Sequence, residues 1–231
     1  MKIIMVPGFW LDASSWDAVV PGLRAAGHDV EPLTLPGLES RDADRSGIGL
    51  RTHVDAVVER IDASEGPVVL VGHSGGGAVI SAAADARCER VVRTIYVDSG
   101  PLGDGGIVSD EWEGDGSDLP LPAWDAFEES ELRDLDEEAR ATFRARAIPH
   151  PFGASTEPQR LSDERRYEIP TTLVASSVPV TVLRELIDAG HPWMAEAARM
   201  RDVEIVGLAT GHWPQLTKPA ELTAVILTAV G

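Results

Sequence analysis

The sequence predicts an α/β protein with a mostly parallel central sheet, because strand-like and helix-like segments alternate along most of the chain. Short apolar, β-branched runs, typical of strands buried on both faces, recur between segments with helical periodicity. Strands and helices that alternate in this way form parallel sheets with helices on both faces. The 231 residues fit one large α/β domain. The predicted strands are 2–6, 67–72, 91–97, 171–175 and 203–208.

The segments between these strands carry helix signals. Residues 14–27 begin with serines that can cap a helix and end at a glycine. Residues 49–64 place their apolar side chains at three- and four-residue spacing, which makes a one-sided stripe. Residues 76–86 are small and apolar, as a helix packed closely on a sheet should be. A last helix is predicted over 219–230, with proline at its first position.

Residues 101–168 interrupt the alternation of strands and helices. They show no buried-strand pattern and are first rich in glycine, proline and acidic residues, then helical over 130–147, then rich in proline. A loop of that length is uncommon inside a compact domain unless it has a function. We therefore predict that 101–168 form a lid over the carboxyl edge of the sheet, while 1–100 and 169–231 form the core.

Composition excludes several classes of protein. The net charge of −18, from 20 basic and 38 acidic residues, disfavours nucleic acid and anionic membrane surfaces as partners. No apolar stretch approaches the roughly 20 residues that span a bilayer, and the start of the chain does not resemble a signal peptide. Cys88 is the single cysteine, so we expect no internal disulfide and no cysteine-based metal site. We expect a cytoplasmic protein that holds no metal. The sequence is compatible with a monomer or a homodimer.

The motif GHSGG, with Ser74 at its centre, follows the predicted strand 67–72 directly and precedes the predicted helix 76–86. Glycine tolerates positive φ and close backbone approach, so this spacing suits a turn too tight for larger residues. A serine on such a strand–turn–helix stands at a helix N-terminus, where backbone N–H groups favour negative charge. We interpret Ser74 as a nucleophile rather than a loop serine, with the Gly75 N–H facing a developing oxyanion.

A nucleophilic serine needs a base at neutral pH, and His212 is the best placed of the six histidines. It follows the last predicted strand and precedes the last helix. Because parallel strands end at the same edge of a sheet, its loop should share a face with the loop of Ser74. The alternative is a surface histidine in a loop. His73 adjoins Ser74 in the sequence, and its side chain is expected to point away, into the sheet or the lid.

The base usually needs an acidic partner that fixes its tautomer and stabilises its cation. The stretch after the predicted strand 171–175 reads SSVPV and contains no carboxylate. Asp98 directly follows the strand 91–97 and therefore lies at the same edge. It is either the acid or a cap for the next turn, and we favour the acid. Asp188 is predicted in a helix that leads away from this edge. If Asp98 is not the acid, the site is a Ser–His dyad.

An oxyanion needs two donors. The loop VPGFW after the first strand can aim the N–H of Phe9 or Trp10 at the Ser74 site, beside the Gly75 N–H. Aromatic side chains in the lid either anchor it to the body or line a pocket, and they are Trp112, Trp124 and Phe127. The candidate substrate-binding residues are Trp10, His73, Trp124, Phe127, Trp193, Met194 and Trp213.

Four motifs together resemble the α/β-hydrolase superfamily over essentially the whole chain, and they are VPGFW, GHSGGG, YVDSGP and TGHWPQLTKP. The compact size and short lid are similar to its small esterase and hydroxynitrile-lyase-like branch. The resemblance implies an α/β-hydrolase fold, with Ser74 as nucleophile, His212 as base, and Gly75 with Phe9 or Trp10 as oxyanion hole. Most members carry their aspartate after the penultimate strand, where this chain has serines. Some carry it after the strand that follows the nucleophile helix, which here is Asp98.

The sequence thus predicts a serine hydrolase that cleaves a small neutral ester, lactone or related acyl compound without a cofactor. A second class is a lyase that uses the same residues as acid and base. Such a site would want a lysine near the leaving group, and Lys218 is the one late lysine. A third class is a non-catalytic receptor for a small ligand, against which the complete Ser/His/Asp set argues.

Overall fold

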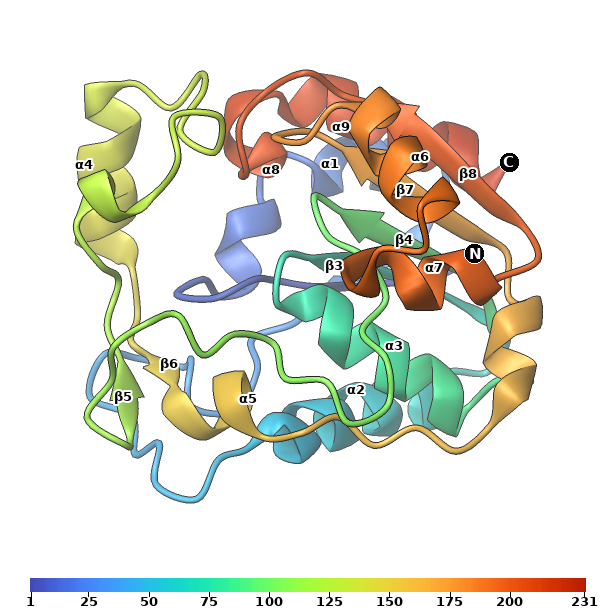
Figure 1. Cartoon of the computed structure of the whole chain (residues 1–231), viewed down its shortest axis with the longest axis horizontal. Helices are drawn as coiled ribbons and strands as arrows, with labels where there is room; N and C mark the ends of the chain where they lie inside the picture. The colour runs from blue at the N-terminus through green and yellow to red at the C-terminus, as the bar shows by residue number, and fades with distance from the viewer.

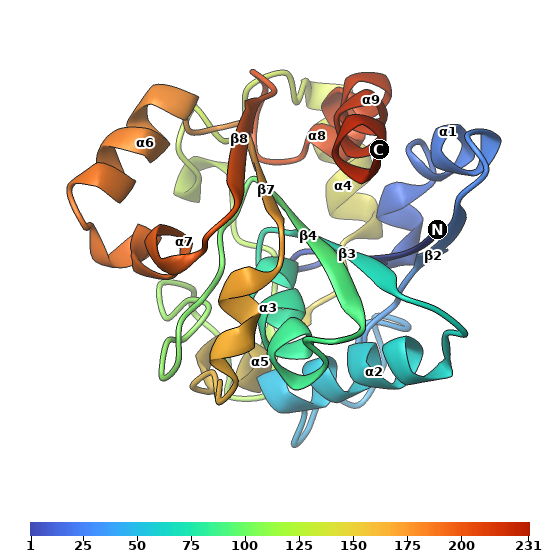
Figure 2. The same ribbon diagram turned by 90° about the vertical axis from the view of Figure 1, so that its right-hand side faces the viewer.

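The computed structural model describes all 231 residues, and its centre is a six-stranded sheet in which all neighbouring strands run parallel. The strand order is β2-β1-β3-β4-β7-β8 (Figure 2). This arrangement confirms the predicted α/β class with a parallel sheet. The strands are β1 (Lys2–Val6), β2 (Asp29–Pro32), β3 (Val68–His73), β4 (Val91–Val97), β7 (Thr171–Ala175) and β8 (Val203–Gly207).

Strand β2 lies at one edge of the sheet and was not predicted. Its sequence, DVEP, contains one fully buried side chain, that of Val30, which pairs with Ile3 of β1. An edge strand exposes one side to solvent and tolerates proline, so it needs no apolar run. The other five strands lie where the sequence predicts them, within one residue at either end.

Helices cover both faces of the sheet (Figures 1 and 2). Alternate residues of each strand supply the two cores, because successive side chains point to opposite faces. Ile3 and Met5 of β1 pack with the helices of one face, whereas Ile4 and Val6 pack with those of the other. The first face carries α1 (Val20–Ala25) and α9 (Pro219–Val230), and the second carries α2 (Leu50–Ala63), α3 (Gly76–Ala86), α6 (Val180–Asp188) and α7 (Ala195–Arg199).

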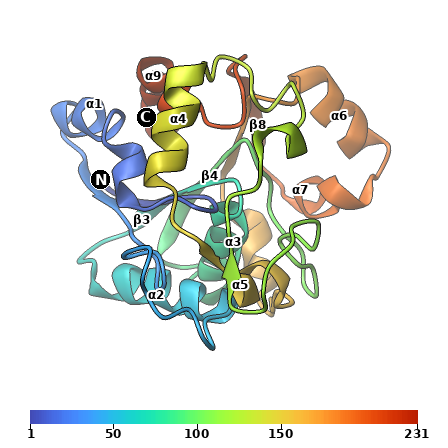
Figure 3. The ribbon, with the colours of Figure 1, turned by 90° about the vertical axis from the view of Figure 1, so that its left-hand side faces the viewer.

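The segment between β4 and β7 contains the predicted lid, residues 101–168, and has structure of its own. Helix α4 stands apart from the sheet, on the left in Figure 1, and lies in front of it when seen from that side (Figure 3). The short strands β5 and β6 pair antiparallel. The elements here are β5 (Asp118–Leu119), η2 (Trp124–Ala126), α4 (Glu137–Arg146), β6 (His150–Pro151), α5 (Phe152–Thr156) and η3 (Glu164–Glu168), and the remaining short helices are η1 (Ala13–Trp16), η4 (Pro192–Met194) and α8 (Pro214–Thr217).

The lid helix is shorter than the predicted 130–147, because α4 begins only at Glu137. Asp136 caps its start by accepting a 2.8 Å hydrogen bond from the Ala139 N–H. Asp134 has φ of 62°, a left-handed conformation that a helix does not accommodate. Residues 130–135 therefore form turns, and they lie beside the loop of His212, as described below.

Three histidines are buried in the native protein: His53, His73 and His150, each no more than 3% exposed. Burial lowers the pKa of His53 to about 4 and the pKa of His73 to about 3. Burial, together with the charges of His53 and Arg45, holds the pKa of His150 well below its ordinary value. All three rings are therefore neutral in the folded protein at neutral pH.

We predict that acidification destabilises the protein between about pH 6.5 and pH 5, because the unfolded chain can protonate these three histidines and the native chain cannot. Their native pKa values lie below the unfolded ones, so their stabilising effect is complete above about pH 6.5 and is lost as the pH falls. The free energy of unfolding should drop by up to about 4 kcal/mol per pH unit, as measured by urea unfolding. His53→Gln should reduce that slope by about one third, and a flat profile would contradict the prediction.

Candidate active site

Ser74 occupies a sharp turn between β3 and α3, with φ of 51°. The glycines on either side make the turn possible, because a Cβ there would collide with backbone. A Cβ on Gly72 would lie 2.7 Å from the Gly76 carbonyl oxygen, and one on Gly76 would lie 2.6 Å from the Pro7 carbonyl oxygen. Gly72 is thus explained by the tightness of the turn itself, and Gly76 by the close approach of the turn to the end of β1.

Backbone strain concentrates at this site. The non-glycine residues with positive φ are Trp10 (63°), Ser74 (51°), Asp98 (45°) and Asp134 (62°). Ser74 and Asp98 directly follow strands β3 and β4, and Trp10 lies in the loop after β1. Residues held in such conformations cost about 1–3 kcal/mol each and cluster where function requires a fixed geometry.

The side chains of Ser74, His212 and Asp98 form a continuous chain of hydrogen bonds. Ser74 Oγ lies 2.8 Å from His212 Nε2, and His212 Nδ1 lies 2.7 Å from Asp98 Oδ2. With neutral imidazole, Nδ1–H donates to the carboxylate and Nε2 accepts from the serine hydroxyl. The three residues that the sequence brings to one sheet edge are therefore in contact, and the Asp98 distance falls within the range expected for an acid partner.

Both oxygens of the Asp98 carboxylate are hydrogen-bonded. Oδ1 accepts from the backbone N–H groups of Ser176 and Ser177, at 3.0 and 2.8 Å, and Oδ2 accepts from Ser177 Oγ at 2.6 Å as well as from His212. Burial raises the pKa of Asp98, but the hydrogen bonds from His212 and Ser177 outweigh it and hold the pKa below its ordinary value. The SSV stretch without a carboxylate thus supplies donors to Asp98.

The predicted oxyanion-hole residues border the same cavity as Ser74. No hydrogen bond within the protein uses the backbone N–H groups of Phe9, Trp10 or Gly75. The Phe9 ring packs so closely over Gly75 that a Cβ there would lie 2.5 Å from a ring carbon. These three N–H groups therefore have no partner within the protein.

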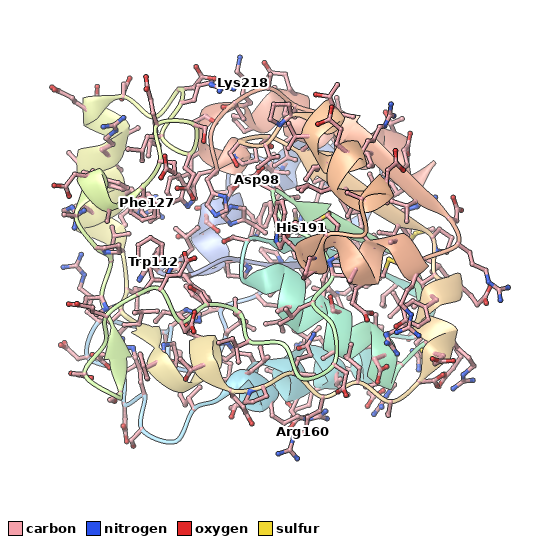
Figure 4. The ribbon with its side chains drawn as sticks, viewed as in Figure 1. Asp98, Trp112, Phe127, Arg160, His191 and Lys218 are labelled. Carbon is pink, nitrogen blue, oxygen red and sulfur yellow. The ribbon has the colours of Figure 1, made fainter.

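The cavity has a volume of about 700 Å³. One end is aromatic and is lined by Trp10, Trp112, Phe127 and Trp213. The opposite end is formed by η4 and α7. In Figure 4, Trp112 and Phe127 lie on one side of Asp98 and His191 lies on the other. Trp193 forms part of this second end and remains 48% exposed. Of the predicted pocket residues, Trp10, Phe127, Trp193 and Trp213 therefore border the cavity.

Three predicted pocket residues do not line the cavity. His73 is fully buried, and its Nε2 donates a 2.6 Å hydrogen bond to the His212 carbonyl oxygen. Met194 is 1% exposed and packs in the core beside Gly100. Trp124 contacts Trp213 edge-on, at 6.2 Å between ring centroids, and the guanidinium of Arg144 lies over its ring. The His73 side chain thus points away from Ser74, as expected, whereas a single sequence does not tell which face of a loop or turn Met194 and Trp124 occupy.

The sequence analysis singled out none of the charged side chains at the α7 end of the cavity, and two of them are largely buried. Arg166 and Glu196 line the end near α7, and their side chains are only 9% and 12% exposed. Arg166 pairs with Glu196 at 3.4 Å and with Asp85 at 3.2 Å. Both residues lie in charge-rich stretches that look like ordinary solvated surface, so no sequence signal distinguishes them.

Three further observations bear on the predicted classes of protein. Lys218, which a lyase would need near the leaving group, does not line the cavity and lies at the margin of the molecule in Figure 4. No group of three or more His, Cys, Asp or Glu side chains is arranged to hold a metal ion. The helices are all too short or too polar to cross a membrane.

The sequence profile of the alpha/beta hydrolase family matches residues 3–225. With the parallel sheet and the strand–turn–helix at Ser74, this match shows that the chain belongs to the alpha/beta hydrolase family. The expected superfamily is therefore confirmed.

Curated relatives match part of the chain. A carbendazim hydrolyzing esterase of Nocardioides is 36% identical over 101 residues, which cover 42% of this chain and 41% of that protein. A pyrethroid hydrolase of Sphingobium wenxiniae is 33% identical over 96 residues, covering 41% of this chain and 34% of that protein. The matched stretches thus span less than half of either relative.

Solved structures match the whole fold. A methylesterase from Arabidopsis has a TM-score of 0.77 at 17% identity and covers 100% of this chain and 98% of its own. At this identity the likeness concerns the fold alone.

We predict that Gly76→Ala destabilises the protein by about 1–3 kcal/mol, because its Cβ would meet the Pro7 and Val6 carbonyl oxygens at 2.6 and 2.7 Å. The measurement is the free energy of unfolding from urea titration at neutral pH. Gly66→Ala is the matched control, since nothing lies within 4 Å of a Cβ there. Equal stability of the two variants would contradict the close approach of the turn to β1.

Proposed function

We propose that the protein is a serine carboxylic ester hydrolase that cleaves small, uncharged esters, lactones or related acyl compounds. The observation that carries the proposal is the hydrogen-bonded chain from Ser74 Oγ through His212 to Asp98, at 2.8 and 2.7 Å. The names of the two curated relatives, an esterase and a pyrethroid hydrolase, support an ester substrate.

In the proposed acylation step, Ser74 Oγ attacks the substrate carbonyl carbon while its proton passes to His212 Nε2. The negative charge that develops on the carbonyl oxygen is stabilised by the Gly75 N–H and by the N–H of Phe9 or Trp10. Asp98 stabilises the imidazolium through Nδ1–H. The imidazolium then donates its proton to the departing alkoxide, and the alcohol leaves behind an acyl group on Ser74.

Deacylation repeats these steps with water as the nucleophile. His212 Nε2 takes a proton from water, which attacks the acyl carbonyl, and the same N–H groups stabilise the second oxyanion. Collapse of this intermediate returns the proton to Ser74 Oγ and releases the carboxylic acid. No metal or organic cofactor takes part in this sequence.

The cavity favours uncharged substrates with an aromatic or bulky apolar group. Its aromatic end, formed by Trp10, Trp112, Phe127 and Trp213, offers flat apolar surface. Its carboxylates include Asp104, Glu111, Glu131 and Glu196, whereas its two cations, Arg166 and Arg199, are both paired with carboxylates. In a chain of net charge −18, this balance of charge disfavours anionic substrates.

The other two classes have less support. A lyase is disfavoured because no lysine borders the cavity. A non-catalytic receptor would leave the strained conformations of Ser74 and Asp98, and their shared contact with His212, without a purpose.

We expect Ser74→Ala to lower kcat at least about 10³-fold while the fold is retained, since the nucleophile is lost. The assay is the hydrolysis of p-nitrophenyl esters with aromatic and aliphatic acyl groups of varied length, with circular dichroism as the check on folding. Near-native esterase activity in pure Ser74→Ala would rule out the proposed function.

Asp98→Asn should lower kcat by up to about 10⁴-fold, because an amide can hold His212 in the wrong tautomer. Asp188→Asn is the control, because Asp188 ends α6 and does not border the cavity. The two variants are compared in kcat on one ester. Similar activity of both would mean that the enzyme works as a Ser–His dyad.

A further inference from the structure

The main chain of His212 is held from two sides by groups outside its own loop. Its backbone N–H donates to the Glu131 carbonyl oxygen of the lid at 2.7 Å. Its carbonyl oxygen accepts from His73 Nε2 at 2.6 Å. These bonds are independent of the two bonds made by its imidazole ring.

We call these two main-chain hydrogen bonds of His212 the clamp. On its His73 side, the donor is held in one orientation. The ring is fully buried, and its bond to a carbonyl oxygen fixes the tautomer with the proton on Nε2. Nδ1 has no partner and faces Gly8, where a Cβ would lie only 2.7 Å away. The ring of His73 stands 5.0 Å from the ring of His212, centroid to centroid, and because burial keeps it neutral it adds no charge beside the base.

The lid side of the clamp depends on Gly211, as the His73 side depends on Gly8. A Cβ on Gly211 would lie 2.3 Å from the Glu131 carbonyl oxygen and 2.5 Å from that of Arg133. The Glu131 side chain stiffens its own turn, because it accepts a 2.8 Å hydrogen bond from the Glu128 N–H. The lid turn can approach His212 this closely because Gly211 has no side chain.

We propose that His73 and the lid turn at Glu131 are positioning elements that hold His212 in place through the catalytic cycle, a role that rests on the proposed esterase function. The ring needs such support because its bond to Ser74 Oγ is lost when that oxygen carries the acyl group. The bonds of the His212 main chain do not involve reacting atoms and persist. His212 then stays where it can activate water.

The sharpest test compares His73→Met with His73→Gln, two side chains of similar volume. The Gln amide nitrogen reaches about as far as Nε2 and can donate to the His212 carbonyl oxygen, whereas Met cannot. We expect Met to lower kcat about 10- to 100-fold with KM unchanged, because a small displacement of the base is costly, and Gln to restore most of the loss. Rates are normalised to active sites titrated with a fluorophosphonate, and thermal unfolding is recorded for each variant.

Gly211→Ala tests the lid side and keeps the proposal falsifiable if His73→Met does not fold. Its Cβ should push the Glu131 carbonyl away from the His212 N–H and lower kcat about 10-fold or more, with little change in KM. Gly66→Ala serves again as the control, because it lies outside the site and has open space around its Cβ.

The clamp is refuted if folded His73→Met, or folded Gly211→Ala, keeps kcat within about twofold of the unaltered protein. It is also refuted if Gln and Met lose activity equally and in proportion to lost stability, which would indicate a packing role. Failure of the clamp is distinguishable from failure of the esterase function. The esterase function fails only if Ser74→Ala stays active, a result that the clamp variants do not affect.

Discussion

The two hydrogen bonds of the His212 ring are the interaction on which the site depends. They join loops that follow three different strands, β3, β4 and β8, and they form only because all of these strands end at the same edge of one parallel sheet. The directions of the Ser74 and Asp98 side chains are then set by the sharp turns directly after their strands, where both residues adopt positive φ. The fold thus supplies the common edge, and the turns supply the directions of the side chains.

The predicted lid, residues 101–168, contacts the site directly. Phe127 packs edge-on to Trp213, the residue after His212, and the Glu131 carbonyl accepts from the His212 N–H. Trp10 links the two parts again, because its ring donates to the Leu119 carbonyl oxygen while its own carbonyl accepts from the Ile148 N–H. A change in residues 101–168 should therefore displace both the loop of His212 and the loop of Trp10.

Much of this account could be predicted from the sequence, because periodicity and glycine spacing follow directly from backbone geometry. The buried strands, the Ser74 turn, and the placing of His212 and Asp98 at one edge are of this kind. What the sequence missed depends on tertiary packing or on the backbone conformation of single residues. Strand β2 is an edge strand without an apolar run, and 130–135 leave the helical pattern because Asp134 is left-handed and Asp136 caps α4. Met194 packs into the core for the same reason, because which side of a turn is buried is decided by what packs on it, whereas His73 points to the interior as expected.

The most direct test of the central claim is to treat the protein with a fluorophosphonate and to locate the adduct by peptide mass spectrometry. A serine activated by His212 beside free oxyanion donors should react once per chain, at Ser74, whereas the other serines of the chain should not react. A single stoichiometric adduct is expected on the peptide that contains Ser74. No adduct on the folded protein, or an adduct on another serine, would contradict it.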